Sequence, residues 1–342
     1  MRARTIATIV LATCVTLFAS TRSVEAQVTP VQNGRVSGTI TSGTQGVAVP
    51  DSVRVRLITL DGSKVGDPVA ASVSSGKYTA TAPIAPGRVF VPHVAYEGID
   101  YFGDPVTFTD SAREATRDFV VYATTRETPP LAIASSTVTV VAIDRERGPI
   151  GLLREDMVAN PSDRVFVGDS TGVTLRIPAP TGTVEATGDN AEGTFTFERG
   201  VVTTTVPIRP GKLTSIVTRY VVAYDPSTEQ YALRVTSPLP AERLVVRVPE
   251  GYVRAVKPEA GARRVADERL PGQESQVLQI VQSTGSVRPG GGVVVNLLGL
   301  SQAVIQTNPL TEPRGAAIAS ALAMLIVGGG TAAASRWHGR AA

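Results

Sequence analysis

Histidine is the side chain that most often moves protons in catalysis near neutral pH. The chain contains two histidines, His93 in the body and His338 close to the C-terminus. The two-residue alternation of residues 89–96 places His93 opposite an aromatic face, so we expect a solvent-facing polar side chain. No nucleophile elbow or oxyanion loop accompanies it. The sequence therefore predicts neither a Ser-His-Asp triad nor a zinc site built from His and Cys.

Carboxylates are the other groups that could do chemistry, in glycoside hydrolysis or calcium binding. Two sets lie in predicted turns and loops: Asp100, Asp104 and Asp110, and Asp163, Asp169 and Asp189. Neither has the spacing of a calcium loop, and acidic residues in turns usually serve as turn formers. The body also lacks tryptophan, a common stacking surface for sugars. We predict no catalytic, cofactor-binding or metal-ligating residues and no cofactor, and keep a carboxylate-based hydrolase as an alternative.

The N-terminus has the pattern of a secretory signal peptide over residues 1–26. Arg2 and Arg4 precede a short apolar run, and Val24-Glu25-Ala26 provides a small-x-small cleavage signature. The single cysteine, Cys14, lies within that run, and a lipoprotein signal stays open as a minor alternative. Ordinary cleavage leaves a mature chain without cysteine. We then expect no disulfide, no thiolate metal site and no cysteine nucleophile.

A second hydrophobic segment lies at residues 315–335, where an uncharged run reaches about 30 Å as a helix, the thickness of a bilayer core. Arg336 and Arg340 follow it in the tail 336–342. The positive-inside rule then predicts a single-pass membrane protein with a cytoplasmic C-terminus and an extracytoplasmic body, periplasmic or extracellular. Two alternatives stay open: a buried helix of a soluble domain, and a C-terminal sorting tail of the PEP type that is removed after export.

The charge of the body is close to neutral, although the whole chain has a net charge of +3. Without residues 1–26, Arg336 and Arg340, the chain has 28 basic and 29 acidic residues. Nucleic-acid binding requires a dense basic footprint. We therefore predict no nucleic-acid partner.

The body reads as β-structure almost throughout. Val53, Val55 and Leu57 alternate with Arg54 and Arg56, the period of a half-buried strand. Short β-branched or aromatic runs separated by turn residues continue this pattern, although we expect a polar excursion at residues 152–166 and a short helix at 257–270. The predicted fold is all-β, with two or three β-sandwich domains in tandem and one C-terminal transmembrane helix. Its predicted parts are a β-sandwich at 33–124, a second at 131–256, a β extension or small third unit at 257–300, and a juxtamembrane spacer at 301–314.

Three stretches of the first domain resemble a known family. They are GRVSGTI at residues 34–40, SGKYT at 75–79 and VAYEGIDY at 94–101. Together they resemble the carboxypeptidase regulatory-like domain over residues 33–124, in the setting of a bacterial envelope protein. The resemblance implies a transthyretin-like, seven-stranded β-sandwich of the carbohydrate-binding-like class. The matching residues are structural turns and strands, so the resemblance bears on fold more than on function.

These features together favour a non-enzymatic, membrane-anchored extracytoplasmic protein. We expect its β-sandwiches to act as a binding or structural module for a polysaccharide or an envelope protein partner. One alternative is an accessory subunit of a membrane transport or assembly complex that docks through its C-terminal helix. The other is the carboxylate-based hydrolase.

Overall fold

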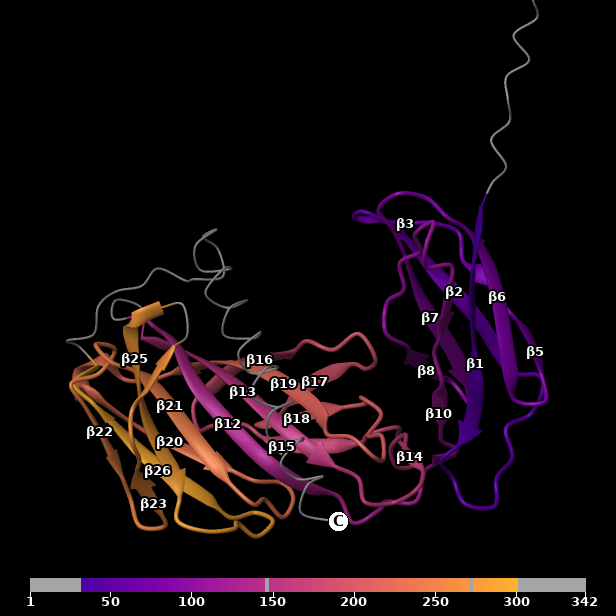
Figure 1. Cartoon of the computed structure of the whole chain (residues 1–342). Helices are drawn as coiled ribbons and strands as arrows, with labels where there is room; N and C mark the ends of the chain where they lie inside the picture. The colour runs from indigo at the N-terminus through magenta and orange to yellow at the C-terminus, as the bar shows by residue number, and fades with distance from the viewer. Residues whose placement is uncertain (1–31, 145–147, 271–272, 301–342) are drawn as a thin grey trace, which may run out of the picture.

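The computed structural model describes residues 32–144, 148–270 and 273–300. These residues form strands joined by turns, with one short 3-10 helix at Pro226–Thr228 (Figure 1). The prediction of an all-β protein is confirmed. Within the described ranges, no helix is long and apolar enough to cross a membrane. The predicted signal peptide, juxtamembrane spacer, transmembrane helix and tail lie outside the described residues.

The first unit contains two five-stranded sheets, and buried side chains from both sheets belong to one apolar core cluster. One sheet has the order β10-β1-β6-β5 with β9 beside β1, and the other has the order β3-β2-β7-β8 with β4 beside β2. The strands are β1 (Asn33–Ser42), β2 (Arg54–Asp61), β3 (Lys64–Val65), β4 (Val69–Ala70), β5 (Ser72–Ser74), β6 (Lys77–Pro83), β7 (Arg88–Tyr96), β8 (Ile99–Phe102), β9 (Glu114–Thr116) and β10 (Phe119–Val121).

Alternation and turn residues explain this unit. Along β2, Val55 and Leu57 are buried while Arg54 and Arg56 are exposed, as the sequence pattern predicts. The turns at residues 75–76 and 97–98 are two-residue connections, and all four residues have positive φ, between 47° and 78°. Such turns match the twist of a hairpin, so they fix the pairing of β5 with β6 and of β7 with β8.

The second unit is built on an eight-stranded sheet with the order β16-β19-β13-β12-β21-β25-β23, with β24 beside β25. Two three-stranded sheets, β15-β18-β17 and β20-β26-β22, complete it. The strands are β12 (Ala132–Ile143), β13 (Pro149–Ala159), β15 (Leu175–Pro178), β16 (Thr183–Gly188), β17 (Phe195–Glu198), β18 (Val201–Thr204), β19 (Thr214–Ala223), β20 (Gln230–Thr236), β21 (Leu244–Pro249), β22 (Ala255–Pro258), β23 (Ala262–Arg264), β24 (Glu268–Leu270), β25 (Gln273–Ser283) and β26 (Gly292–Leu298).

One core cluster connects all three sheets of the second unit, from Leu131 to Leu300. Strand β25 pairs with β21, and β26 pairs with β20. Residues 257–300 therefore extend the sheets to which residues 131–256 contribute.

Two local expectations are wrong, one of them in part. Residues 152–159 are not a polar excursion, because β13 runs through the middle of the large sheet between β12 and β19, and only residues 160–164 lie outside the strands. Its Arg154 and Asp156 are buried and bind each other, so charge within this strand does not require solvent. Residues 257–270 form short strands instead of a helix, because β22 pairs with β26 and β23 and β24 pair with β25.

Candidate binding face of the first unit

His93 lies in β7 and is buried, with 1% of its surface exposed. The expectation of a solvent-facing side chain is wrong, because side chains from the neighbouring strands β2 and β8 surround the imidazole. Arg56 of β2 donates from Nε to His93 Nδ1 at 3.0 Å, and Asp100 Oδ1 lies 2.7 Å from His93 Nε2. The ring of Phe102 packs on the imidazole with centroids 4.9 Å apart.

This arrangement fixes the histidine and occupies both of its ring nitrogens. A guanidinium can only donate hydrogen bonds, so Nδ1 of His93 is the acceptor and Nε2 carries the proton that is donated to Asp100. No ring nitrogen is left to take a proton from a nucleophile. The geometry assigns His93 a structural task, the cross-linking of β2, β7 and β8.

The predicted aspartates are spread over the molecule. Each contacts a different neighbour: Asp100 with His93, Asp104 with Arg117, Asp110 with Arg113, Asp163 with Gln45, Asp169 with Arg176, and Asp189 with Arg219. Hydrogen bonds from the Thr171 side chain, and then the Arg176 guanidinium, hold the pKa of Asp169 well below its usual range. Among the described residues, no group of three or more His, Cys, Asp or Glu side chains could hold a metal ion.

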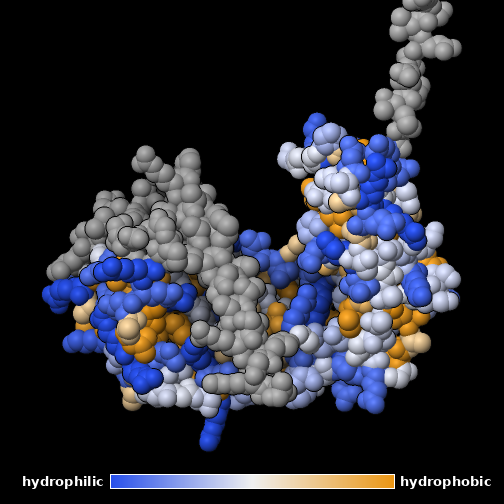
Figure 2. Space-filling view, in the orientation of Figure 1, coloured by the Kyte–Doolittle hydropathy of each residue, from blue (hydrophilic) through white to orange (hydrophobic). Residues whose placement is uncertain are grey.

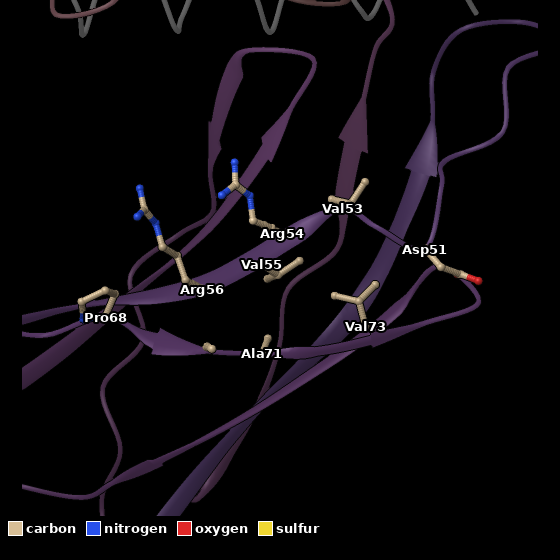
Figure 3. A pocket seen from close by; sticks show the side chains of 9 residues that line it. Asp51, Val53, Arg54, Val55, Arg56, Pro68, Ala71 and Val73 are labelled. Carbon is tan, nitrogen blue, oxygen red and sulfur yellow. The ribbon is translucent and has the colours of Figure 1, made fainter.

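An open groove of about 400 Å³ lies along the edge of β2 (Figure 3). The groove is lined by Asp51, Val53, Arg54, Val55, Arg56, Pro68, Ala70, Ala71 and Val73. Val53 and Val55 are only 6% and 4% exposed and form an apolar floor. Figure 3 shows Arg54 and Arg56 projecting from β2 away from the segment that carries Ala71 and Val73. The groove thus combines an apolar floor with a cationic rim.

The charge at this groove is predominantly positive. Arg54 and Arg56 are two residues apart on one face of β2, about 7 Å along the strand. In the part of the chain that the structure describes, Arg54 forms no salt bridge. The Asp51 carboxylate instead accepts a hydrogen bond from the Ser75 backbone N–H at 2.8 Å. Arg56 Nε donates to His93, so the Nη groups of Arg56 and the guanidinium of Arg54 are the donors for two carboxylates of an extended ligand.

Sequence reasoning did not identify this groove. The Arg-Val-Arg alternation gives the face of each side chain, but most half-buried strands carry charged residues on their outer face. The decisive feature is that β4 pairs with β2 at Arg56 and Leu57, and that the residues before Arg56 have no partner in β4. That boundary depends on where a loop crosses between the two sheets, and periodicity does not encode it.

The same face continues into a junction with the second unit. Arg209 is 7% exposed, forms an ion pair with Glu192, and donates from Nη2 to the Asp100 carbonyl at 3.0 Å. Its guanidinium lies 5.7 Å from the centre of the Tyr101 ring. Because Asp100 also binds His93, one residue of β8 connects the histidine network to the second unit.

Backbone pairing supports this junction. Strand β11 (Thr124–Thr125) pairs in parallel with β14 (Val165–Phe166), and Thr44 donates from its hydroxyl to the Asp163 carbonyl. In Figure 2 the two units meet at the bottom of the view and separate toward the top. The candidate face is therefore held in a defined position relative to the second unit.

Comparison with known proteins does not assign this chain to a family. No family model matches the chain, and no curated protein matches it. An M1 zinc metallopeptidase from Deinococcus radiodurans aligns with a TM-score of 0.32 and 10% identity over 49% of this chain and 42% of that chain. The BcpA major pilin subunit of Bacillus cereus aligns with a TM-score of 0.18 and 10% identity over 79% and 85%.

The T6 backbone pilin of serotype M6 Streptococcus pyogenes aligns with a TM-score of 0.17 and 8% identity over 78% of this chain and 74% of that chain. This chain aligns with less than half the length of the M1 zinc metallopeptidase chain. Likenesses this weak carry no argument about activity, substrate or partner.

Proposed function

We propose that this chain is a non-enzymatic, membrane-anchored extracytoplasmic binding module, and that its ligand binds in the groove beside β2. The observation that carries this proposal is an apolar floor of buried valines next to two exposed arginines. Apolar surface with a few well-placed polar groups is the usual composition of a binding site. The histidine beside it is committed to structural hydrogen bonds, which favours binding over proton transfer.

The paired sheets around two large cores support a tandem β-sandwich body. The sequence patterns at residues 1–26 and 315–335 support export and anchoring. In this arrangement the N-terminal unit projects from the membrane and the second unit connects it to the span. The groove then faces the extracytoplasmic space, where a polysaccharide or an envelope protein is accessible.

The test is a titration of the full-length chain, purified in detergent, with poly-glutamate, alginate and neutral dextran. We expect the two anionic polymers to bind more tightly than dextran, with affinity that falls as salt screens the arginines. Arg54→Gln should weaken anionic binding by at least about tenfold, because a charge-assisted hydrogen bond contributes about 1.5–3 kcal/mol.

Arg35→Gln is the matched control, because Arg35 is an exposed arginine on β1, in the opposite sheet of the same unit. It should leave binding unchanged. If Arg54→Gln and Arg35→Gln bind the anionic polymers equally well, the groove is not the ligand site. Turnover of any of these polymers would contradict the non-enzymatic assignment.

A further inference from the structure

We propose that the occupant of the groove is an acidic polypeptide segment in extended conformation, which adds a strand to the free edge of β5. This inference rests on the proposed function and specifies the ligand of the same site. It follows from the strand edge that opens onto the groove, from the residues of its floor, and from the spacing of its arginines.

Among the described strands, β5 is at the edge of its sheet and pairs only with β6. The two-residue turn Ser75-Gly76, with φ of 50° and 70°, makes Ser74 and Lys77 the hydrogen-bonded pair that closes the hairpin. Hydrogen-bonded and non-hydrogen-bonded pairs alternate along antiparallel strands. The N–H and C=O of Val73 therefore point away from β6, toward the groove that Val73 lines.

The facing edge of the other sheet is partly occupied at this point. Ala71 donates its N–H to the Val55 carbonyl at 3.0 Å, and β4 pairs with β2 at Arg56 and Leu57. The outward backbone groups of Val73 in β5 are therefore the ones to which an added strand can bind.

Side chains of the groove match an alternating ligand. In an extended chain, successive residues point to opposite sides, so apolar residues can pack on Val53 and Val55 while every second residue faces the rim. Carboxylates two residues apart on that side are separated by about 7 Å, the same interval as Arg54 and Arg56 on β2. The charge complementarity selects acidic residues for those positions.

A polysaccharide fits these observations less well. No residue that lines the groove is aromatic, and aromatic faces are the usual apolar surface for sugar rings. A sugar polymer also lacks the alternating N–H and C=O groups that strand edges bind. The three residues of β5 accommodate about three residues of added chain, roughly 10 Å, so the interaction is short and reversible.

The probe is the peptide acetyl-(Val-Glu)4-amide, titrated into the full-length chain. Two analogues carry N-methyl groups, one on every valine amide and one on every glutamate amide. Neighbouring amides of an extended chain point to opposite edges, so only one analogue loses the hydrogen bonds to β5. We expect that analogue to bind about fivefold more weakly for each lost bond, and the other to bind like the parent peptide.

The matched protein variant is Val73→Pro, which removes the outward N–H but not a bond to β6, because proline is tolerated at a sheet edge. Val73→Pro should weaken binding of the parent peptide, and it should not change binding of the analogue that no longer pairs with β5. Unfolding midpoints check that the variant folds, and the N-methyl series stands independently of it. The peptide acetyl-(Val-Lys)4-amide should bind more weakly than the glutamate peptide.

Equal affinity of both analogues and the parent would overturn strand addition. If alginate then competed with the peptide and Arg54→Gln weakened both, the groove would be a site for anionic polysaccharide and the proposed function would stand alone. If no anionic probe responded to Arg54→Gln, both proposals would fail.

Discussion

The buried ion pair of Arg154 and Asp156 determines how the second unit responds to mutation. Both residues belong to β13, and their side chains are 1% and 0% exposed. Two parallel hydrogen bonds join them, from Nε to Oδ2 at 2.8 Å and from Nη2 to Oδ1 at 3.0 Å. Burial disfavours the charged guanidinium, yet the adjacent Asp156 carboxylate keeps the pKa of Arg154 above its ordinary value.

The same guanidinium reaches the other two sheets. Its Nη1 donates to the Thr236 carbonyl in β20 at 3.0 Å and lies 3.5 Å from the Pro178 carbonyl in β15. Arg154 therefore connects the eight-stranded sheet to both three-stranded sheets. A change at this pair affects the packing of three layers at once.

We predict that Asp156→Asn destabilises the second unit by about 3–5 kcal/mol, because it leaves a buried guanidinium without its counter-charge. A typical domain has about 5–15 kcal/mol of total stability, so this loss is about a fifth of it or more. Removing both charges together should cost far less, since no uncompensated charge is left. The double variant Arg154→Met/Asp156→Leu should lie within about 2 kcal/mol of the wild type.

The assay is urea unfolding of the full-length chain, followed by hydrogen exchange of peptides from each unit, so that the two units are measured separately. The control is Asp189→Asn, which breaks the exposed pair with Arg219 and should cost less than about 1 kcal/mol. The reasoning is refuted if Asp156→Asn costs no more than the control. It is also refuted if the double variant is as unstable as Asp156→Asn alone.

Three further changes have defined outcomes. Burial raises the pKa of Glu155, so its ionisation opposes folding as pH rises. The stability of Glu155→Gln in urea should therefore exceed that of the wild type by an amount that grows from pH 4 to pH 7. A stability difference that stays constant with pH would contradict this. Burial raises the pKa of Tyr78 to about 12, and its hydroxyl donates to the Arg117 carbonyl at 2.7 Å. Tyr78→Phe should lose about 1 kcal/mol at pH 7 but avoid the wild-type loss of stability in thermal melts between pH 10 and 12. Arg209→Ala removes the ion pair with Glu192, and we expect at least about tenfold faster hydrogen exchange in β11 and β14. Unchanged exchange would show that backbone pairing alone holds the junction.

Periodicity predicted the elements whose two faces differ in polarity. The start of β2 is the clearest case, because Val55 and Leu57 alternate with Arg54 and Arg56 and only one register buries the apolar pair. The same logic failed for β13, where Arg154 and Asp156 share the buried face with Leu152 and Val158. A local pattern cannot show that two charges will satisfy each other inside a sheet.

Expectations about the candidate site failed for a related reason. Alternation placed His93 on the face opposite Phe90, which is correct for its direction along β7. Its burial depends on Arg56 and Asp100, which come from neighbouring strands 37 positions before it and 7 positions after it. The groove likewise depends on where β4 stops covering β2. Exposure of a strand face is a property of the assembled sheets, and only their pairing determines it.

The described residues contain no cysteine, so disulfide bonds between them cannot hold these layers together. Buried polar side chains stand at the places where layers meet: Arg154 between three sheets, Arg209 between two units, and His93 across three strands. Each of them donates to a partner whose position is set by a different strand. Apolar packing alone would tolerate sliding of one layer over another, because it has no direction, whereas these hydrogen bonds are lost when the layers shift. Directional bonds at the junctions therefore fix the arrangement, while the valine- and leucine-rich cores supply most of the free energy of folding.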